Sequence, residues 1–227
     1  VHSAENDANM GMNEKGVAAS SSFVRSEGNE TTRLRSPDLH RHILRNFSAM
    51  PEIRAYLQEL LKSDTPVSSG CLSYIDGAGN AAVFEISADR WLIEYNAADQ
   101  RRNAQNLSGI VMRANQFHQH QDGTDNLDTG GRYETARANM LALRELGVLN
   151  AQTIIQGYAD GQQRYDLIRY GTGRPLTNIA LDISMPAIVA HGVHPGEDPA
   201  LATLWVMLGP ATHVIAVPAW VRIGDGI

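Results

Sequence analysis

Three strand-like segments follow one another with very short connections, and this spacing restricts the fold more than any other feature. Residues 70–76, 80–87 and 90–95 are rich in apolar and aromatic residues, and the turn sequence Asp-Gly-Ala-Gly at 76–79 joins the first two. Parallel strands need a crossover connection of about a dozen residues or more, so connections this short allow only antiparallel pairing. The segments therefore predict an antiparallel meander.

Two helices are predicted just before this meander. Ser36 as a cap and Pro37 in the first turn open a helix that extends to residue 47, and Ser48 and Pro51 play the same parts for a second helix. Apolar residues recur at helical spacing in the second helix: Met50, Ile53, Leu57, Leu60 and Leu61. This spacing predicts that one face of the helix is buried.

The remaining elements place strands before and after helices. A strand is predicted at 17–24, one helix from Arg132 to Gly147, and another helix from Ala151. Further strands are predicted at 110–114, 183–190, 201–208 and 214–221. This order of blocks favours an α+β fold over a repeated βαβ fold. The length of 227 residues favours a single domain.

Composition limits the classes of partner. The net charge is -6 and the basic residues form no long run, so neither nucleic acid nor an anionic membrane surface is indicated as a partner. No stretch approaches the roughly 18 to 20 apolar residues of a membrane-spanning helix. The single cysteine, Cys71, excludes an internal disulfide. Homo-oligomer formation stays open.

Residues 11–16 read Gly-Met-Asn-Glu-Lys-Gly and resemble the signature of the linear amide C–N hydrolases. That family includes choloylglycine hydrolases, penicillin V acylases and the C45 acyltransferases. The segments that extend the resemblance, in the family's order, are 73–85, 111–117, 131–137, 203–210 and 217–220. Bile-salt and penicillin V hydrolases usually have an asparagine shortly after the signature, whereas this chain has Ser-Ser-Ser-Phe at 20–23. This departure favours the C45-like branch.

The resemblance implies a fold and a chemistry. The fold would be a four-layer αββα sandwich of the amino-terminal-nucleophile (Ntn) hydrolase type, spanning residues 1–227 as one domain. The reaction would be hydrolysis of a small linear, non-peptide amide, or transfer of its acyl group, through a covalent acyl-enzyme. Autoproteolysis would expose the nucleophile, whose own α-amino group acts as the base. By resemblance Asn115 would donate a hydrogen bond to the oxyanion and Arg132 would hold nucleophile or substrate. No cofactor and no metal are implied.

The nucleophile itself has no counterpart near the start of this sequence. The signature normally lies well downstream of the nucleophile, whereas only ten residues precede Gly11 here. We therefore expect the domain to be truncated at its amino terminus, with the nucleophile supplied upstream or by a separate chain. Gly70 and Cys71 superficially resemble a self-cleavage junction, but the strand that normally follows the family's nucleophile is missing there. A buried, structural Cys71 is the favoured interpretation.

Two alternatives stay open beside the amide hydrolase. The chain could be an inactive homologue or fragment that retains a substrate pocket as a binding module. A metal-dependent hydrolase could instead use His118, His120, His191 and His194, with Asp122, Asp125 and Asp198 nearby in sequence. These residues match no recognised metalloenzyme spacing, which argues against a metal site. Within the signature, Glu14 and Lys15 are adjacent, so their side chains diverge, and a structural role is predicted for this turn.

Overall fold

The computed structural model describes residues 2–3, 7–8, 10–24, 34–98, 109–113, 117, 132–159, 187–194, 196–208 and 214–221. The chain divides into two compact units. One unit consists of Val1–Leu127, Gly192–Ala202 and Trp220–Ile227, and the other of Asp128–His191 and Thr203–Ala219. The single domain expected from the sequence stays a prediction.

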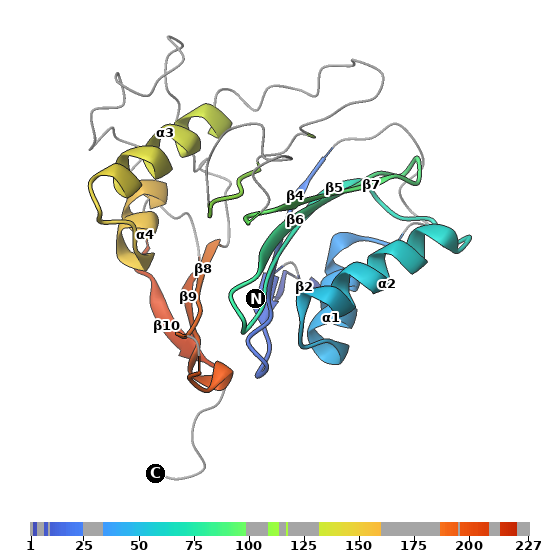
Figure 1. The fold of residues 1–227 in the computed structure, drawn as a ribbon, viewed down its shortest axis with the longest axis horizontal. Helices are drawn as coiled ribbons and strands as arrows, with labels where there is room; N and C mark the ends of the chain where they lie inside the picture. Colours follow the sequence, from blue (N-terminus) through green and yellow to red (C-terminus); the bar gives the residue numbers. More distant parts are fainter. Residues whose placement is uncertain are drawn as a thin grey trace. The chain divides into compact units, whose positions relative to one another are not determined.

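The first unit is built on a five-stranded sheet in the order β3-β4-β5-β6-β7, with every neighbouring pair antiparallel (Figure 1). Its strands are β3 (Met10–Met12), β4 (Ala18–Phe23), β5 (Gly70–Ile75), β6 (Ala81–Ile86) and β7 (Leu92–Asn96). A small hairpin of β1 (His2–Ser3) and β2 (Asp7–Ala8) precedes the sheet. The predicted meander and the predicted strand at 17–24 are thus confirmed.

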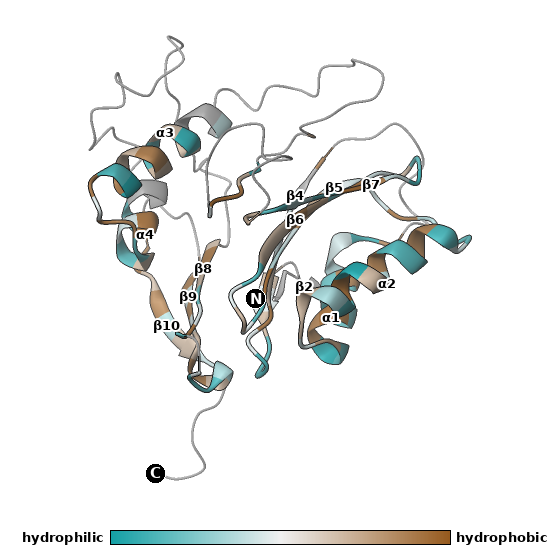
Figure 2. Cartoon of the chain, viewed as in Figure 1, coloured by the Kyte–Doolittle hydropathy of each residue, from teal (hydrophilic) through white to brown (hydrophobic). Residues whose placement is uncertain are grey.

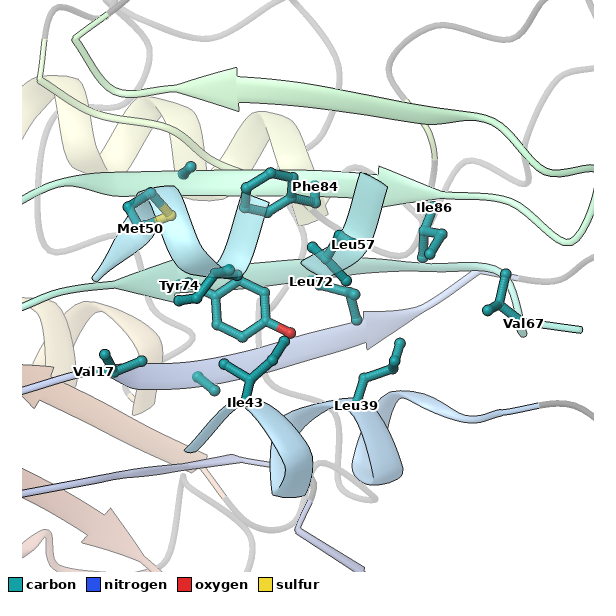
Figure 3. Packing of buried hydrophobic residues seen from close by; sticks show 13 residues of the cluster. Val17, Leu39, Ile43, Met50, Leu57, Val67, Leu72, Tyr74, Phe84 and Ile86 are labelled. Carbon is teal, nitrogen blue, oxygen red and sulfur yellow. The ribbon is translucent and has the colours of Figure 1, made fainter. Parts of the chain in front are cut away.

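Two helices, α1 (Ser36–Asn46) and α2 (Met50–Lys62), cover one face of this sheet (Figure 1). Both helices carry hydrophobic as well as hydrophilic residues (Figure 2). Their buried residues include Leu39, Ile43 and Leu57, which pack against Leu72 and Phe84 of the sheet (Figure 3). Because side chains alternate across a strand, the residues next to Leu72 and Phe84 project from the opposite face. The larger hydrophobic cluster therefore lies between this face and the helices, while a smaller one that includes Cys71 and Val83 lies on the opposite face.

The helix caps differ from the predicted ones by one residue. The residues that cap α1 and α2 are Arg35 and Ala49, whereas Ser36 and Ser48 were predicted. At α2, the Glu52 carboxylate accepts hydrogen bonds from the backbone N–H of Ser48 at 2.7 Å and from that of Ala49 at 3.0 Å. Glu52, the third residue of the helix, thus binds the backbone N–H groups of the residues that precede the helix, so no serine cap is needed.

Residues 110–113 form no strand, which makes the predicted strand at 110–114 wrong for its described part. The segment crosses the face of the sheet opposite the helices. Val111 packs against the cluster that contains Cys71 and Val83, and the Arg113 side chain binds Glu85. Side chains of this segment therefore contact the face of the sheet, although the segment is not one of its strands. A continuous apolar run does not distinguish these two arrangements.

The second unit contains α3 (Arg132–Glu145), α4 (Ala151–Ala159) and a three-stranded sheet in the order β10-β9-β8. These strands are β8 (Ala187–His191), β9 (Thr203–Met207) and β10 (Val217–Trp220), and β8 pairs antiparallel with β9. α3 ends at Glu145, and Gly147 two residues later has a φ of 69°, which is typical of the residue that follows a helix. The class is thus mixed α+β with antiparallel sheets, while the four-layer αββα arrangement stays a prediction. No helix among the described residues is long and apolar enough to cross a bilayer.

A buried histidine gives the first unit a predicted dependence of stability on pH. His40 of α1 is fully buried, its Nδ1 lies 3.1 Å from the Tyr74 hydroxyl, and burial lowers its pKa to about 4. An unfolded histidine has a pKa of about 6.5, so below that value the unfolded chain binds the proton more strongly than the folded one. We expect the free energy of unfolding to fall by roughly 3 kcal/mol as the pH drops from about 6.5 to about 4.

Urea denaturation across this pH range measures the effect. His40→Gln retains a hydrogen-bonding group for Tyr74 but cannot titrate, so its profile is expected to be flatter than that of the wild type. The matched control is His42→Gln, which replaces an exposed histidine on the same helix. Equal slopes for wild type and His40→Gln would contradict the assignment.

Candidate active site

The signature at residues 11–16 forms the end of β3 and the turn into β4. The side chain of Asn13 makes four hydrogen bonds there. The Asn13 Nδ2 donates to the backbone oxygens of Leu44 at 3.0 Å and Phe47 at 2.9 Å. Its Oδ1 accepts from the backbone N–H groups of Lys15 at 3.0 Å and Val17 at 2.9 Å. An asparagine amide has both donors and acceptors, so one side chain closes the turn and binds the end of α1.

Gly16 brings this turn against a second turn of the first unit. Its φ is +82°, and an added Cβ would lie 3.0 Å from the Cα of Gly77 and 3.0 Å from the Cβ of Pro199. Gly77 belongs to the turn at 76–79, whose Asp76 carboxylate accepts a hydrogen bond of 2.9 Å from the first residue of α2, Met50. Residues 14 and 15 are exposed. The predicted structural role of the signature turn is therefore confirmed: it joins the sheet to α1 and to the turn at 76–79.

Removal of the Asn13 side chain is expected to destabilise the protein. Asn13→Ala loses four hydrogen bonds and leaves the two carbonyl groups at the end of α1 without this donor. At a net value of about 1 kcal/mol for each hydrogen bond, we expect a loss of roughly 2 to 4 kcal/mol in the free energy of unfolding. Asn46→Ala is the control, because Asn46 is exposed and binds only His42 of its own helix. Denaturant melts that show equal losses for the two variants would contradict a central role for Asn13.

Substitutions at two glycines with the same φ angle distinguish the cost of steric contact from the cost of backbone strain. Gly16 and Gly79 both have φ of +82°, but an added Cβ meets close atoms only at Gly16 and open space at Gly79. Gly79→Ala is expected to cost about 1 kcal/mol through backbone strain alone. Gly16→Ala is expected to cost about 2 kcal/mol more, since the neighbouring atoms are backbone and a proline ring. Thermal melts of both variants test this difference, and equal melting temperatures would contradict close packing at Gly16.

The sheet face opposite α1 and α2 carries an unusual set of polar residues. Strand pairing places one row across four strands: Ser22, Cys71, Glu85 and Ile93. The next row consists of Ser20, Ser73, Val83 and Tyr95. We call this surface the polar face. It brings the Cys71 thiol, the Glu85 carboxylate and the Tyr95 phenol together on one side of the sheet.

A buried ion pair lies on the polar face. The Arg113 Nε donates to the Glu85 Oε1 at 2.6 Å, with the two side chains 5% and 0% exposed. The Arg113 guanidinium also lies over the Tyr95 ring, 3.8 Å from its centroid. Burial, and then the Glu85 charge, raise the pKa of Tyr95 to about 12, while Arg113 opposes this rise. Tyr95 is therefore a neutral phenol at ordinary pH and does not supply a phenolate base.

The surroundings of Cys71 disfavour the reactive thiolate form. The residue lies inside β5, its side chain is fully buried, and its neighbours on the adjacent strands are Ser22 and Glu85. Burial, and then the Glu85 charge, raise the pKa of the thiol to about 12. The thiolate is the reactive form, and at neutral pH almost none would exist here. The favoured interpretation of Cys71 as a buried structural residue is therefore supported by its surroundings.

Described residues with packing partners stand on either side of the predicted oxyanion donor in the sequence. Asn115 itself lies outside the described residues, but Arg113 precedes it by two positions and Phe117 follows it by two. Phe117 is buried and meets Trp91 edge to face, with ring centroids 4.6 Å apart. Both anchors are thus fixed on the polar face of the first unit.

The other predicted site residues are placed only in part. Arg132 begins α3 as expected, but its side chain lies outside the described part of the structure. The catalytic roles of Asn115 and Arg132 therefore stay predictions. Of the histidines in the metal alternative, His118 and His120 are not among the described residues, while His191 and His194 are exposed. The described residues contain no group of three or more possible metal ligands.

The sequence analysis predicted no functional role for Glu85 or Arg113, although the sequence contains a feature that points to their burial. Each is a lone charged residue within an apolar run, Ala-Ala-Val-Phe-Glu-Ile at 81–86 and Ile-Val-Met-Arg at 110–113. Charged residues are almost never fully buried unless they are paired. Each of these two residues is therefore expected to have a partner of opposite charge, although the sequence does not say which one.

Comparison with known proteins adds a family-level finding. Residues 6–146 match the family model described as acyl-coenzyme A:6-aminopenicillanic acid acyl-transferase. Among solved structures, the chain is similar to a mutant of the conjugated bile acid hydrolase from Clostridium perfringens, with 13% sequence identity and a TM-score of 0.42. That similarity covers 96% of this chain and 78% of the other. No curated protein matches the chain.

Proposed function

The chain belongs to the acyl-coenzyme A:6-aminopenicillanic acid acyl-transferase family, and from this membership we propose that it transfers the acyl group of a linear, non-peptide amide to an acceptor or to water. The resemblance to the C45-like branch is thereby confirmed at the level of the family. The observation that carries the proposal is the extent of the match, because residues 6–146 include the signature, Asn115 and Arg132.

The proposed reaction proceeds through a covalent acyl-enzyme. An amino-terminal Cys, Ser or Thr attacks the amide carbonyl carbon while its own α-amino group takes the proton. The carbonyl oxygen becomes an oxyanion, to which Asn115 donates a side-chain N–H, and Arg132 holds nucleophile or substrate by charge-assisted hydrogen bonds. The carbon–nitrogen bond then breaks and the amine leaves with the proton. Water or a second amine attacks the acyl-enzyme and regenerates the nucleophile.

The nucleophile in this proposal comes from a segment upstream of the signature or from a separate chain, and autoproteolysis exposes it. The buried position of Cys71 supports this choice, since a thiol with a pKa of about 12 inside a strand is a poor nucleophile. The substrate would be a small molecule.

Amino-terminal sequencing of the full-length mature protein, combined with intact mass after mixing with phenylacetyl-4-nitroanilide, tests the proposal. We expect a mature chain that begins with Cys, Ser or Thr, release of 4-nitroaniline, and a phenylacetyl adduct on that first residue. Substitution of this residue by alanine should abolish both adduct and release.

Two other results would favour the alternatives. Release of 4-nitroaniline that EDTA abolishes, without an acyl adduct, would overturn the proposal in favour of a metal-dependent hydrolase. Tight binding of the amide with neither release nor adduct would favour a binding module.

A further inference from the structure

We propose that the buried Glu85–Arg113 ion pair is a positioning device for the reaction, which sets the placement of the oxyanion donor at Asn115. The inference rests on the proposed function, because it gives Glu85 and Arg113 a role only where Asn115 has one. Neither residue touches the reacting atoms in this account. They act through the segment that carries Asn115.

The pair has the geometry of a rigid support. The Arg113 Nε lies 2.6 Å from the Glu85 Oε1, and its Nη1 donates to the Met112 backbone oxygen at 2.6 Å. The guanidinium plane is further fixed over the Tyr95 ring. One side chain therefore binds the sheet at β6, packs against β7, and holds its own backbone.

The location of the pair connects it to the donor. Residues 110–113 form no strand, and two of their side chains contact the sheet: Arg113 binds Glu85, and Val111 packs against the cluster that contains Cys71 and Val83. Arg113 precedes Asn115 by two residues, and the buried Phe117 follows it by two. Only two residues of chain therefore link each anchor to the predicted donor, and consecutive Cα atoms are about 3.8 Å apart. Movement of either anchor would displace the donor.

A contribution to stability alone does not explain why an ion pair is buried at this place. Burying two charges costs several kcal/mol in desolvation, and apolar replacements of buried ion pairs are often neutral or stabilising. An apolar side chain at 113 would fill the same space without fixing a direction. A charge-assisted bond at 2.6 Å fixes both distance and direction, which is what an oxyanion donor needs from its support.

A double-mutant cycle with Glu85→Gln and Asn115→Ala in the full-length mature enzyme tests the inference. Glu85→Gln retains the shape and weakens the pair, and we expect kcat for phenylacetyl-4-nitroanilide to fall about 10- to 100-fold, since a misplacement of about 1 Å can cost about 100-fold. In the Asn115→Ala background, the same substitution should change kcat less than about two-fold, because the donor is already absent. An equal fall in both backgrounds, or no fall in the first, would overturn the inference.

Two controls separate this role from simple destabilisation. Glu94→Gln weakens the Arg54–Glu94 pair on the opposite face of the same sheet, where the Arg54 Nε to Glu94 Oε2 distance is also 2.6 Å, and should leave kcat unchanged. The fraction of active enzyme in every variant is measured by the amount of acyl-enzyme formed. If Asn115→Ala alone leaves kcat unchanged, both the donor assignment and the inference are overturned, whereas equal falls in both backgrounds overturn the inference and leave the proposed function intact.

Amide hydrogen exchange gives a readout that needs no substrate. In Glu85→Gln, the amides of residues 110–113 should exchange at least about 10-fold faster, because the contact that holds this segment is weakened. The amides of the β4–β5 ladder should keep their wild-type exchange rates. Unchanged exchange at 110–113 would show that the pair does not hold the segment.

Discussion

Replacement of Asn115 by alanine is expected to lower kcat by about 100- to 1000-fold, the usual cost of one oxyanion-hole donor. The donor acts on charge that develops only in the transition state, so kcat should fall while KM changes little. Steady-state kinetics with phenylacetyl-4-nitroanilide and the full-length mature enzyme measure both constants. Asn115→Asp should be at least as impaired, because a carboxylate in place of the amide would repel the oxyanion.

The neighbouring amide residue provides the matched control. Gln116→Ala removes an amide side chain one position along, for which neither the sequence nor the family resemblance assigns a role. We expect its kcat to stay within about two-fold of the wild type. A raised KM with normal kcat in Asn115→Ala would instead assign Asn115 to substrate binding, and normal values of both constants would remove it from the site.

The elements that local patterns determine could be predicted from the sequence. Connections of a few residues left the strands β5, β6 and β7 no alternative to antiparallel pairing. Helical spacing of apolar residues, with Pro51 in the first turn, predicted α2. Backbone geometry and short-range hydrogen bonding set such elements, and both are visible within a window of a few residues.

Elements that depend on distant contacts were not predictable in this way. The apolar run at 110–112 reads as a strand, yet residues 110–113 lie on the polar face because Arg113 binds Glu85, which is 28 positions earlier in the sequence. Cys71 and Glu85 likewise lie opposite each other on neighbouring strands because of the strand register. No local pattern gives that register, although the lone charges in apolar runs would have justified a search for partners.

The site shows the same division between local and distant information. The resemblance predicted roles for Asn115 and Arg132, because the family attaches such roles to short motifs at fixed places in the chain. It assigned nothing to contacts such as the Glu85–Arg113 ion pair, which depend on the packing of separate segments. The Gly16 contact with Gly77 is of this second kind, since two motifs recognised separately turn out to pack against each other.

The largest loss of stability is expected from Arg113→Met. This substitution removes the cation at 2.6 Å from the Glu85 carboxylate and leaves that fully buried group beside an apolar side chain. Loss of one partner from a buried pair typically costs about 3 to 5 kcal/mol, because the remaining buried charge loses its counter-ion. Urea denaturation is expected to show a decrease of that size in the free energy of unfolding.

Two comparison variants make the expectation specific to burial. Arg54→Met removes the cation of the Arg54–Glu94 pair, whose side chains are 34% and 18% exposed, and should cost about 1 kcal/mol or less. The double variant Glu85→Leu/Arg113→Met removes both charges and should recover most of the lost stability, since an apolar pair carries no desolvation cost. Equal losses for Arg113→Met and Arg54→Met would mean that water reaches Glu85. If stability recovers in the double variant while kcat stays low, the pair serves the placement of the donor more than the stability of the fold.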